Sequence, residues 1–388
     1  MTGSEKSVSQ TGGDRFPIVD VDTHTGTFTS APELQKHLPE RWRDWLAEVG
    51  FRYPTMSHDR PRQRLLVCRT DAYSPDGAAP GTDPDFVRTQ LLDGNDISGA
   101  VMNETYGYCA VGGRPMPDAL SVALARAYND LRIEKWMASD DRWYGSVTVS
   151  HDTSGEAAAE EIRRCKEDSG KYNDRWVQAL LPPDNERPAG HPKYWPMFEV
   201  CEHYGIPVGF HVLATRRLTG TGIPNYFLEE HADMAAFNFP LVASLIFEGV
   251  FERFPRLKIA LLELSWSWAV PFSWRLDQAY DLHRSELPHL PRKPSEYFAE
   301  HFWFASQPME EPENLGSFDD VYQLFEDTFG DKLMYSSDYP HWDYDLPETV
   351  PQTLPIATRR KILGETASNL YGIPLRAGTG LPVELAAA

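Results

Sequence analysis

Cysteine is scarce in this sequence of 388 residues, and the few cysteines lie far apart. There are four of them, and no two form a C-x-x-C pair: Cys68, Cys109, Cys165 and Cys201. This spacing excludes a cysteine-rich zinc site and a disulfide-stapled scaffold, because both need cysteines grouped at short intervals. We therefore expect reduced thiols and a cytoplasmic protein.

Long apolar runs are missing as well, and basic residues are in the minority. No stretch approaches the roughly 18 apolar residues that a membrane-spanning helix needs. Residues 1–15 are polar and lack the apolar centre of a signal peptide, so we expect a disordered tail there. The 37 basic and 57 acidic residues give a net charge of −20. A chain this acidic binds nucleic acid and anionic membranes poorly, and we expect neither as a partner.

What the sequence does contain is a regular alternation of short apolar segments and helical patterns. Eight segments are typical of strands that are buried on both faces: 18–22, 99–102, 144–149, 176–180, 208–211, 257–262, 302–305 and 333–336. Helical patterns lie between them at 119–137, 155–167, 193–204, 240–253 and 318–329. This order predicts an α/β fold, the (β/α)8 TIM barrel. The competing fold is an open doubly wound sheet, but the sequence lacks the glycine-rich phosphate turn which that fold uses.

Two segments do not fit the repeat. Residues 28–85 are too long for a strand–helix loop, so we expect an insertion after the first strand that covers one face of the barrel. Its arginines fit either a solvated surface or a clamp for a substrate carboxylate. Residues 213–236 contain Arg216 and are a candidate lid. We expect one barrel domain over residues 16–374 and a C-terminal tail at 375–388.

Side chains that suit a metal ion stand at the ends of four predicted strands. They are Asp22 and His24 on the first strand, His211 on the fifth, Glu263 on the sixth, and Asp338 and His341 at the eighth. The carboxyl ends of barrel strands meet at one mouth, so we expect these side chains to lie together. Taken singly, each is more often a structural residue of a core or turn. Their joint placement predicts a divalent metal site, because imidazole and carboxylate are ligands of Zn²⁺ and similar ions.

Several longer motifs resemble the amidohydrolase superfamily, in the branch that includes aminocarboxymuconate-semialdehyde decarboxylase. The matching segments include IVDVDTH, IPVGFH, FPRLKIALLE and SSDYPHWD. The resemblance implies that the metal ligands are Asp22, His24, His211 and Asp338, and that Asp338 can also take a proton from a metal-activated water. Members with two metals carry a bridging lysine at the fourth strand, and the segment WVQALLPP has none. We therefore expect one divalent ion, Zn²⁺ in the first place and Mn²⁺ as the alternative.

The sequence departs from the family pattern at three positions. Asp22 replaces the first histidine of the usual His-x-His, and Thr366 replaces an asparagine of the last helix, which we interpret as structural variation. Glu263 stands where the family often has a catalytic histidine. This change favours hydrolysis of an amide or amidine-like C–N bond, with His341 or Glu263 as general acid or base. Decarboxylation of an aromatic or unsaturated acid is the alternative, and a metal-binding protein without catalysis is a third hypothesis.

The expected substrate is a small molecule or a short peptide. Candidate substrate contacts are Trp266, Trp268, Gln307 and Arg216, although the two tryptophans fit packing against the next helix equally well. His231 and six other histidines belong to no such group, and we interpret them as surface or packing residues. The long insertion and the many aromatic residues offer material for an interface, so a homo-oligomer is an open alternative.

Overall fold

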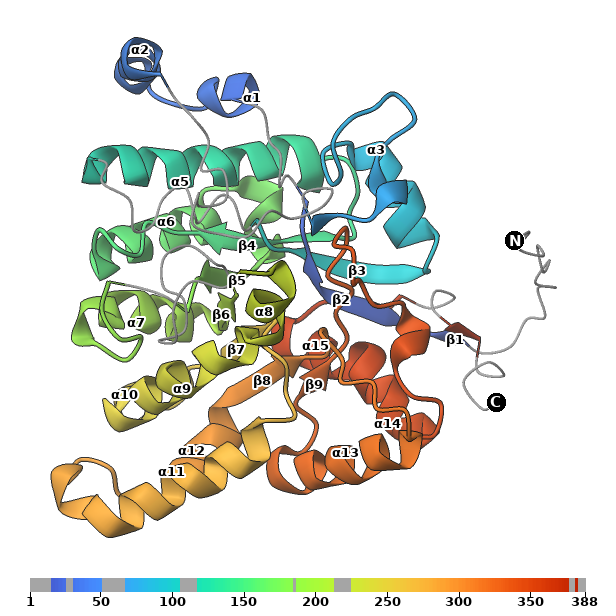
Figure 1. Ribbon diagram of the computed structural model, residues 1–388. Helices are drawn as coiled ribbons and strands as arrows, with labels where there is room; N and C mark the ends of the chain where they lie inside the picture. The colour runs from blue at the N-terminus through green and yellow to red at the C-terminus, as the bar shows by residue number, and fades with distance from the viewer. Residues whose placement is uncertain are drawn as a thin grey trace.

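The predicted barrel is present in the computed structural model, which describes residues 15–25, 31–50, 67–104, 117–183, 186–212, 225–376 and 381–382. Eight parallel strands form one sheet in which each strand pairs with the next along the chain. They are β2 (Ile18–Thr23), β3 (Ile97–Met102), β4 (Trp143–Thr148), β5 (Trp176–Leu181), β6 (Val208–His211), β7 (Ile259–Leu262), β8 (Phe302–Ala305) and β9 (Leu333–Met334). Figure 1 shows the strands in the middle of the molecule.

The strands form at the predicted positions because their residues are apolar and covered on both faces. Every residue of β2 to β7 is buried. Neighbouring strands also approach closely at Gly209 of β6, where an added Cβ would lie 2.7 Å from Oε1 of Gln178 on β5. The prediction of eight buried parallel strands is therefore confirmed.

Backbone hydrogen bonds join the first strand, β2, to the residues that follow the last strand, β9, and close the barrel there. Val21 N donates to Tyr335 O at 3.1 Å, and His24 N donates to Tyr339 O at 2.7 Å. Thr23 also forms a parallel bridge with Tyr339. Closure turns the sheet into a barrel and brings the two ends of the barrel domain into contact.

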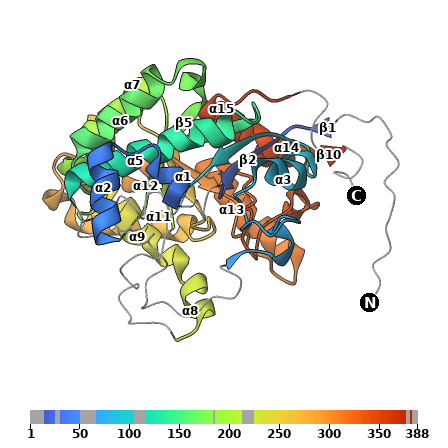
Figure 2. The same cartoon turned by 90° about the horizontal axis from the view of Figure 1, so that it is seen from above.

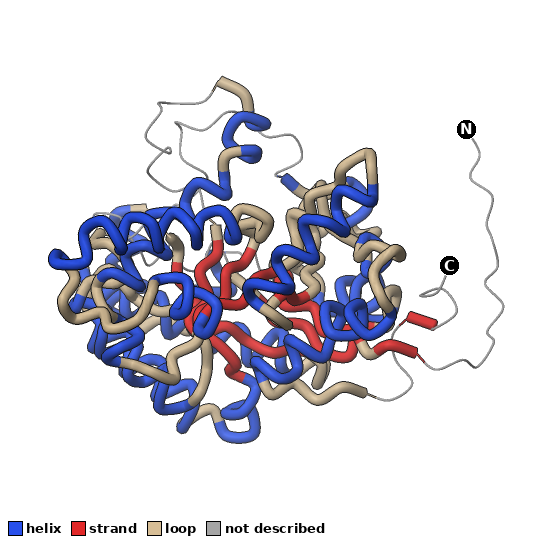
Figure 3. The backbone as a smooth tube through the Cα atoms, turned by 90° about the horizontal axis from the view of Figure 1, so that it is seen from below, coloured by secondary structure: helices blue, strands red, loops and turns tan. Residues whose placement is uncertain are grey.

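Helices connect the strands and surround them, as the blue tubes around the red strands in Figure 3 show. The longer ones are α5 (Asp118–Arg132), α6 (Gly155–Glu167), α7 (Trp195–Tyr204), α9 (Asn238–Phe247), α11 (Ala269–His283) and α13 (Leu315–Phe329). The shorter ones are α8 (Phe227–Ala232), α10 (Val250–Arg253), α12 (Pro294–His301), α14 (Ile356–Arg360) and α15 (Thr366–Tyr371). Helix α6 begins where predicted, because the Ser154 side chain accepts a hydrogen bond from Ala157 N at 3.0 Å. In the part of the chain described, no helix is long and apolar enough to cross a membrane.

The segment predicted as an insertion contributes helices to the outside of the barrel. Three α-helices are described within this segment or at its end, namely α1 (Ala31–Gln35), α2 (Glu40–Val49) and α3 (Pro84–Val87). Helix α1 lies beside α5 (Figure 1), and Glu33 forms an ion pair with Lys135 at 2.7 Å. Another part of the segment reaches the loop after β9, where Cys68 forms an antiparallel bridge with His341. The segment 28–85 thus reaches two places. Its helix α1 lies on the outer helix layer, and its residue Cys68 lies beside the ends of the strands.

The two predicted tails fall almost entirely outside the described residues. Their described parts include a short antiparallel pair, β1 (Arg15–Phe16) with β10 (Leu381–Pro382). The second of these strands lies within the segment predicted as a C-terminal tail. A pairing between segments this short and this far apart leaves no periodic signal in the sequence.

Candidate metal centre

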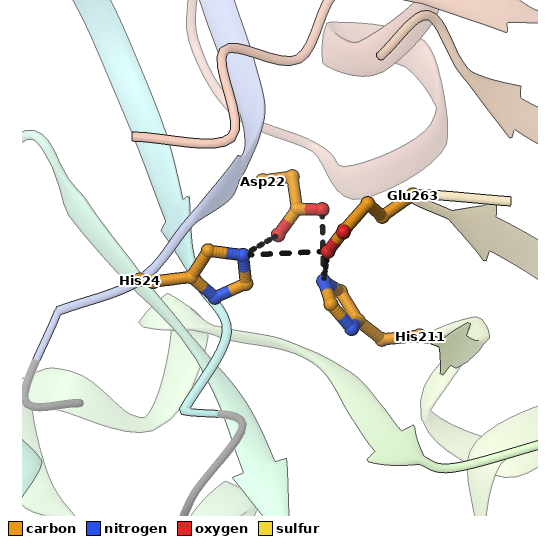
Figure 4. Close-up of side chains that lie close together, drawn as sticks. All are labelled: Asp22, His24, His211 and Glu263. Atoms are coloured by element: carbon orange, nitrogen blue, oxygen red, sulfur yellow. Dashed lines mark ion pairs between the residues drawn. The ribbon is translucent and has the colours of Figure 1, made fainter. Parts of the chain in front are cut away.

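Four side chains meet where three barrel strands end. They are Asp22 on β2, His24 directly after it, His211 at the end of β6 and Glu263 directly after β7. Nε2 of His211 lies 3.1 Å from Oδ2 of Asp22 and 3.1 Å from Oε2 of Glu263. Nε2 of His24 lies 3.7 Å from Oδ1 of Asp22 and 3.8 Å from Oε2 of Glu263. Figure 4 shows the four side chains pointing toward one another, and one ligand atom from each lies within 4.8 Å of all the others.

Asp338 and His341 extend this cluster from the loop after β9. Oδ1 of Asp338 lies 2.7 Å from Nε2 of His24 and 2.7 Å from Nδ1 of His341. The ring of His341 stacks on the ring of His24, with centroids 4.4 Å apart. Glu263 belongs to this second group as well. The structure therefore brings together all six residues that the sequence placed at the mouth of the barrel.

Three carboxyl groups share this buried space. Asp22, Glu263 and Asp338 have exposed fractions of 1%, 6% and 0%. Burial raises the pKa of Glu263, and the charge of Asp338 raises it further. Burial also raises the pKa of Asp22, but the neighbouring His211 outweighs this effect, so the pKa of Asp22 lies below its usual range. The pKa of Asp338 is lowered in the same way, because His341 outweighs its burial. Carboxylates this close need positive charge between them, and a divalent cation provides it.

The donor set also fits such an ion chemically. Imidazole nitrogen together with carboxylate oxygen suits Zn²⁺ and Mn²⁺. Asp22, His24, His211 and Glu263 stand on a barrel strand or directly after one, so the strands fix the spacing of these ligand atoms. Strand β5, the fourth strand of the barrel, contains no lysine that could bridge a second ion. These residues form a candidate divalent metal centre.

Neighbouring groups orient the candidate ligands. Nδ1 of His24 donates to the backbone carbonyl of Asn103 at 2.9 Å. Nδ1 of His211 donates to the backbone carbonyl of Val212 at 2.5 Å. Each of these bonds leaves Nε2 directed at the cluster. Nδ2 of Asn103 also donates to Oδ1 of Asp22 at 2.7 Å, and Gln178 donates to Oδ1 of Asn103 at 2.8 Å. Asn103 was not among the residues expected at the site, although it directly follows the apolar strand β3, just as His24 directly follows β2.

The backbone is left-handed at two of the candidate residues. The angle φ is 50° at Glu263 and 60° at Asp338, and it is 57° at Ser265 nearby. Residues other than glycine rarely adopt this conformation, which costs of the order of 1–3 kcal/mol and is concentrated at functional sites. The strain therefore marks the same two loops as the metal cluster does.

A polar chain leads from the strand ends to helix α8. Gln307, shortly after β8, donates from Nε2 to Oδ2 of Asp343 at 3.2 Å. The same carboxylate oxygen lies 2.7 Å from Nε2 of His231 on α8. Helix α8 projects from the barrel in Figures 2 and 3, and the ring of Trp342 lies 5.4 Å from the His231 ring. The sequence did not connect His231 with any other residue, because only the folded chain brings it to Asp343.

The two tryptophans occupy packing positions. Trp266 is fully buried against the aromatic rings of α13, and its role at the floor of a substrate pocket stays a prediction. Trp268 is partly buried, stacks on Phe298 of α12 and donates from Nε1 to the carbonyl of Leu264 at 3.0 Å. These contacts correspond to the packing alternative for both residues. Arg216 lies outside the described residues.

Known proteins resemble the chain over most of its length. The 2-amino-3-carboxymuconate-6-semialdehyde decarboxylase of Dictyostelium discoideum is 28% identical over 297 residues, which are 75% of this chain and 74% of that protein. The solved structure of 5-carboxyvanillate decarboxylase from Sphingomonas paucimobilis has a TM-score of 0.62 and 19% identity, with 92% of this chain and 100% of that chain covered. For 2,6-dihydroxybenzoate decarboxylase from Rhizobium the TM-score is 0.60 and the identity 19%, with 92% and 98% covered. At such low identity the solved structures establish the shared fold alone.

A family profile gives the assignment. The profile described as amidohydrolase matches residues 72–373, which is well over half of the chain. The matched segment contains His211, Glu263, Asp338 and His341, whereas Asp22 and His24 precede it. The profile agrees with the resemblance seen in the sequence motifs, and the chain belongs to the amidohydrolase family.

Proposed function

We propose that this protein is a metal-dependent decarboxylase that removes CO₂ from a small aromatic or unsaturated carboxylic acid without oxidation. The observation that carries the proposal is the similarity to a named decarboxylase over three quarters of both chains. The buried cluster of carboxylates and imidazoles adds a place where such chemistry can occur. The sequence alone favoured hydrolysis of a C–N bond, and the comparisons support the alternative better.

Asp22, His24, His211 and Asp338 are the residues that would hold the metal ion. A bound divalent ion would draw an anionic substrate to the mouth and stabilise negative charge on it. Relatives of this fold have been solved with manganese, among them a 5-carboxyvanillate decarboxylase from Novosphingobium aromaticivorans. We therefore consider Mn²⁺ beside the Zn²⁺ that the sequence suggested, at one ion per chain.

A decarboxylase must also place a proton on the carbon that loses its carboxyl group. Glu263 is suited to this step, because burial raises the pKa of its carboxyl and keeps the group protonated to higher pH. His341 is the second candidate. Burial lowers the pKa of its imidazole, but the Asp338 carboxylate outweighs burial and raises this pKa to about 9. We assign proton delivery to Glu263, and we assign to His341 the task of holding Asp338 in its ionised form.

We assign substrate binding to the polar group formed by Gln307, Asp343 and His231, which connects the strand ends with α8. Gln307 is 1% exposed and, as an amide beside the strand ends, can hydrogen-bond a carboxylate or phenol oxygen. Asp343 fixes the Gln307 amide on one side and His231 on the other. The exposed ring of Trp342 next to them offers a face for an aromatic substrate.

The test is a substrate panel in D₂O. The protein is purified without chelator, supplied with Mn²⁺ or Zn²⁺, and incubated with 2,6-dihydroxybenzoate, 5-carboxyvanillate and related acids. We expect one CO₂ per substrate consumed and one deuterium on the vacated carbon by NMR, and neither with His211→Ala. A panel of amides is run in parallel. Cleavage of an amide with uptake of water, together with no CO₂ from any acid, would identify a hydrolase instead.

A further inference from the structure

A pocket of about 270 Å³ lies at the end of the barrel opposite the metal centre. Lys258 and Lys332 come directly before β7 and β9, so they stand at the amino ends of the strands, whereas the metal cluster stands at the carboxyl ends. The wall is completed by Trp303 of β8, by Lys361, and by Thr366 of α15. None of these residues has been assigned a role in the proposed reaction.

The carboxylates of this pocket already have cationic partners. Asp331 lies 2.9 Å from Nζ of Lys361. Glu365 lies 2.7 Å from the guanidinium of Arg360. Each of these ion pairs has a net charge close to zero. The net charge of the pocket therefore comes from the remaining lysines.

Lys258 and Lys332 are those remaining cations. Within the described residues, neither has a carboxylate at ion-pair distance. Nζ of Lys332 lies 3.2 Å from the centroid of the Trp303 ring and donates to the backbone carbonyl of Glu300 at 3.0 Å. Burial and, to a smaller extent, the charge of Lys258 together lower the pKa of Lys332 to about 8. Two ammonium groups therefore repel each other across one pocket.

Thr366 supplies a second and independent observation. Its side chain is 4% exposed, and its hydroxyl has no hydrogen-bond partner within the described residues. Buried hydroxyl groups are seldom left without a partner. Thr366 lines the pocket, but its hydroxyl oxygen has almost no accessible surface, so it reaches a ligand there only after the side chain rotates about χ1.

We propose that this pocket binds a dianionic phosphate group, either free phosphate or the head of a small phosphate monoester. Lys258 and Lys332 supply two positive charges, which match a phosphate monoester at neutral pH. Lysine ammonium groups bind phosphate as point charges, so the two lysines are the groups that carry the proposal. The overall charge of −20 repels anions from most of the surface, so binding here depends on this local pair of lysines.

Calorimetric titration of the metal-loaded protein with inorganic phosphate and with glycerol phosphate tests the proposal. We expect one site per chain, with affinity that falls as salt is added. Lys258→Gln should weaken binding at least tenfold. The matched control is Lys36→Gln, which removes the same charge from a surface lysine paired with Glu134. Equal affinity of Lys258→Gln and wild type, or no phosphate binding by wild type, would overturn the proposal.

Three further measurements show where phosphate binds and how selective the site is. They distinguish binding in this pocket from binding at the metal centre, and they distinguish a phosphate site from a general anion site. Phosphate could bind at the metal, so His211→Ala is titrated as well, and binding must survive in this variant. Loss of binding there would place the anion at the metal and overturn the proposal. Lys258 has no carboxylate partner to lose, so Lys258→Gln should raise Tm slightly in phosphate-free buffer and should reduce the rise in Tm that phosphate causes. Succinate, a dianion of different shape, should bind at least tenfold more weakly than phosphate, and tighter binding of succinate would exclude a phosphate site.

Discussion

Nε2 of His211 and Oε2 of Glu263 lie 3.1 Å apart and join the ends of β6 and β7. The contact places the Glu263 carboxylate among the candidate ligand atoms. The same residue stands where the resemblance seen in the sequence led us to expect a catalytic histidine. Its role therefore decides how this chain carries out its chemistry.

Glu263→Gln should lower kcat by about 10²-fold or more, in the range of a lost general acid or base. Metal content should not change, because Asp22, His24, His211 and Asp338 remain to hold the ion. Steady-state kinetics and elemental analysis of the same preparation measure both effects. Glu248→Gln, an exposed position at the end of α9, is the control for the chemical change. Loss of metal in Glu263→Gln would make Glu263 a ligand, and an unchanged kcat would make it structural.

His211→Ala and Asp338→Asn should each abolish activity while leaving the fold in place. Both remove a metal-binding atom, whereas the barrel core is built from other side chains. Asparagine tolerates the left-handed backbone that Asp338 adopts, so this variant isolates the loss of charge. Circular dichroism follows the fold and elemental analysis follows the metal. Near-normal turnover of either variant at saturating metal contradicts the ligand assignment.

Removal of the divalent ion should lower Tm and abolish activity together. Without the ion, Asp22, Glu263 and Asp338 share a buried space with too little positive charge. A ligand that binds only the folded state raises Tm, so loss of the ion reverses that gain. Differential scanning calorimetry before and after chelation, and after return of Mn²⁺ or Zn²⁺, measures the effect. A stoichiometry near two ions per chain contradicts the single site.

Trp266→Ala should destabilise the protein by about 3–5 kcal/mol, as expected for loss of a large buried aromatic side chain. KM of the remaining folded enzyme should stay unchanged, because the ring packs on α13. Urea unfolding and substrate titration separate the two effects. A raised KM with normal stability would return Trp266 to the substrate pocket.

Lys332→Met should change how stability depends on pH. The folded pKa of Lys332 is about 8, below the value of about 10.4 expected for an unfolded lysine. Between these two pH values the folded chain binds fewer protons than the unfolded chain, so the free energy of unfolding rises with pH. The variant lacks this rise, so the wild type should gain stability over it as pH increases from about 8 to about 10. Urea unfolding along this range measures the difference, and Lys36→Met serves as control. A constant difference contradicts the lowered pKa.

The sequence was sufficient for the barrel and for the residues at its mouth. Buried parallel strands are short and apolar, so all eight appear as separate runs between helical patterns. Polar residues that end such runs, Asp22 and His211 among them, are conspicuous and must lie at one end of the barrel. The candidate cluster could therefore be predicted before its distances were known.

Contacts between loops could not be predicted in this way. The pairing of His231 with Asp343 joins α8 to the loop after β9, and no periodicity relates these segments. Trp266 shows a related problem, because its place near Glu263 in the sequence fitted a substrate contact and packing against the next helix equally well. The backbone is left-handed at Ser265, between the two residues, and the indole ring is buried against α13.

The hydrogen bond between His24 and Asp338 spans 314 positions of the chain. During synthesis, β2 leaves the ribosome long before β9, so the first strand of the barrel has no closing partner while most of the domain is being made. A nascent chain that ends before Asp338 lacks one of the four residues that we propose to hold the ion. Contacts between such distant segments form late and slow the folding of a domain. We therefore expect the protein to bind its metal ion late, after the barrel has closed. The concentration of available metal would then affect the folded protein and not the folding chain.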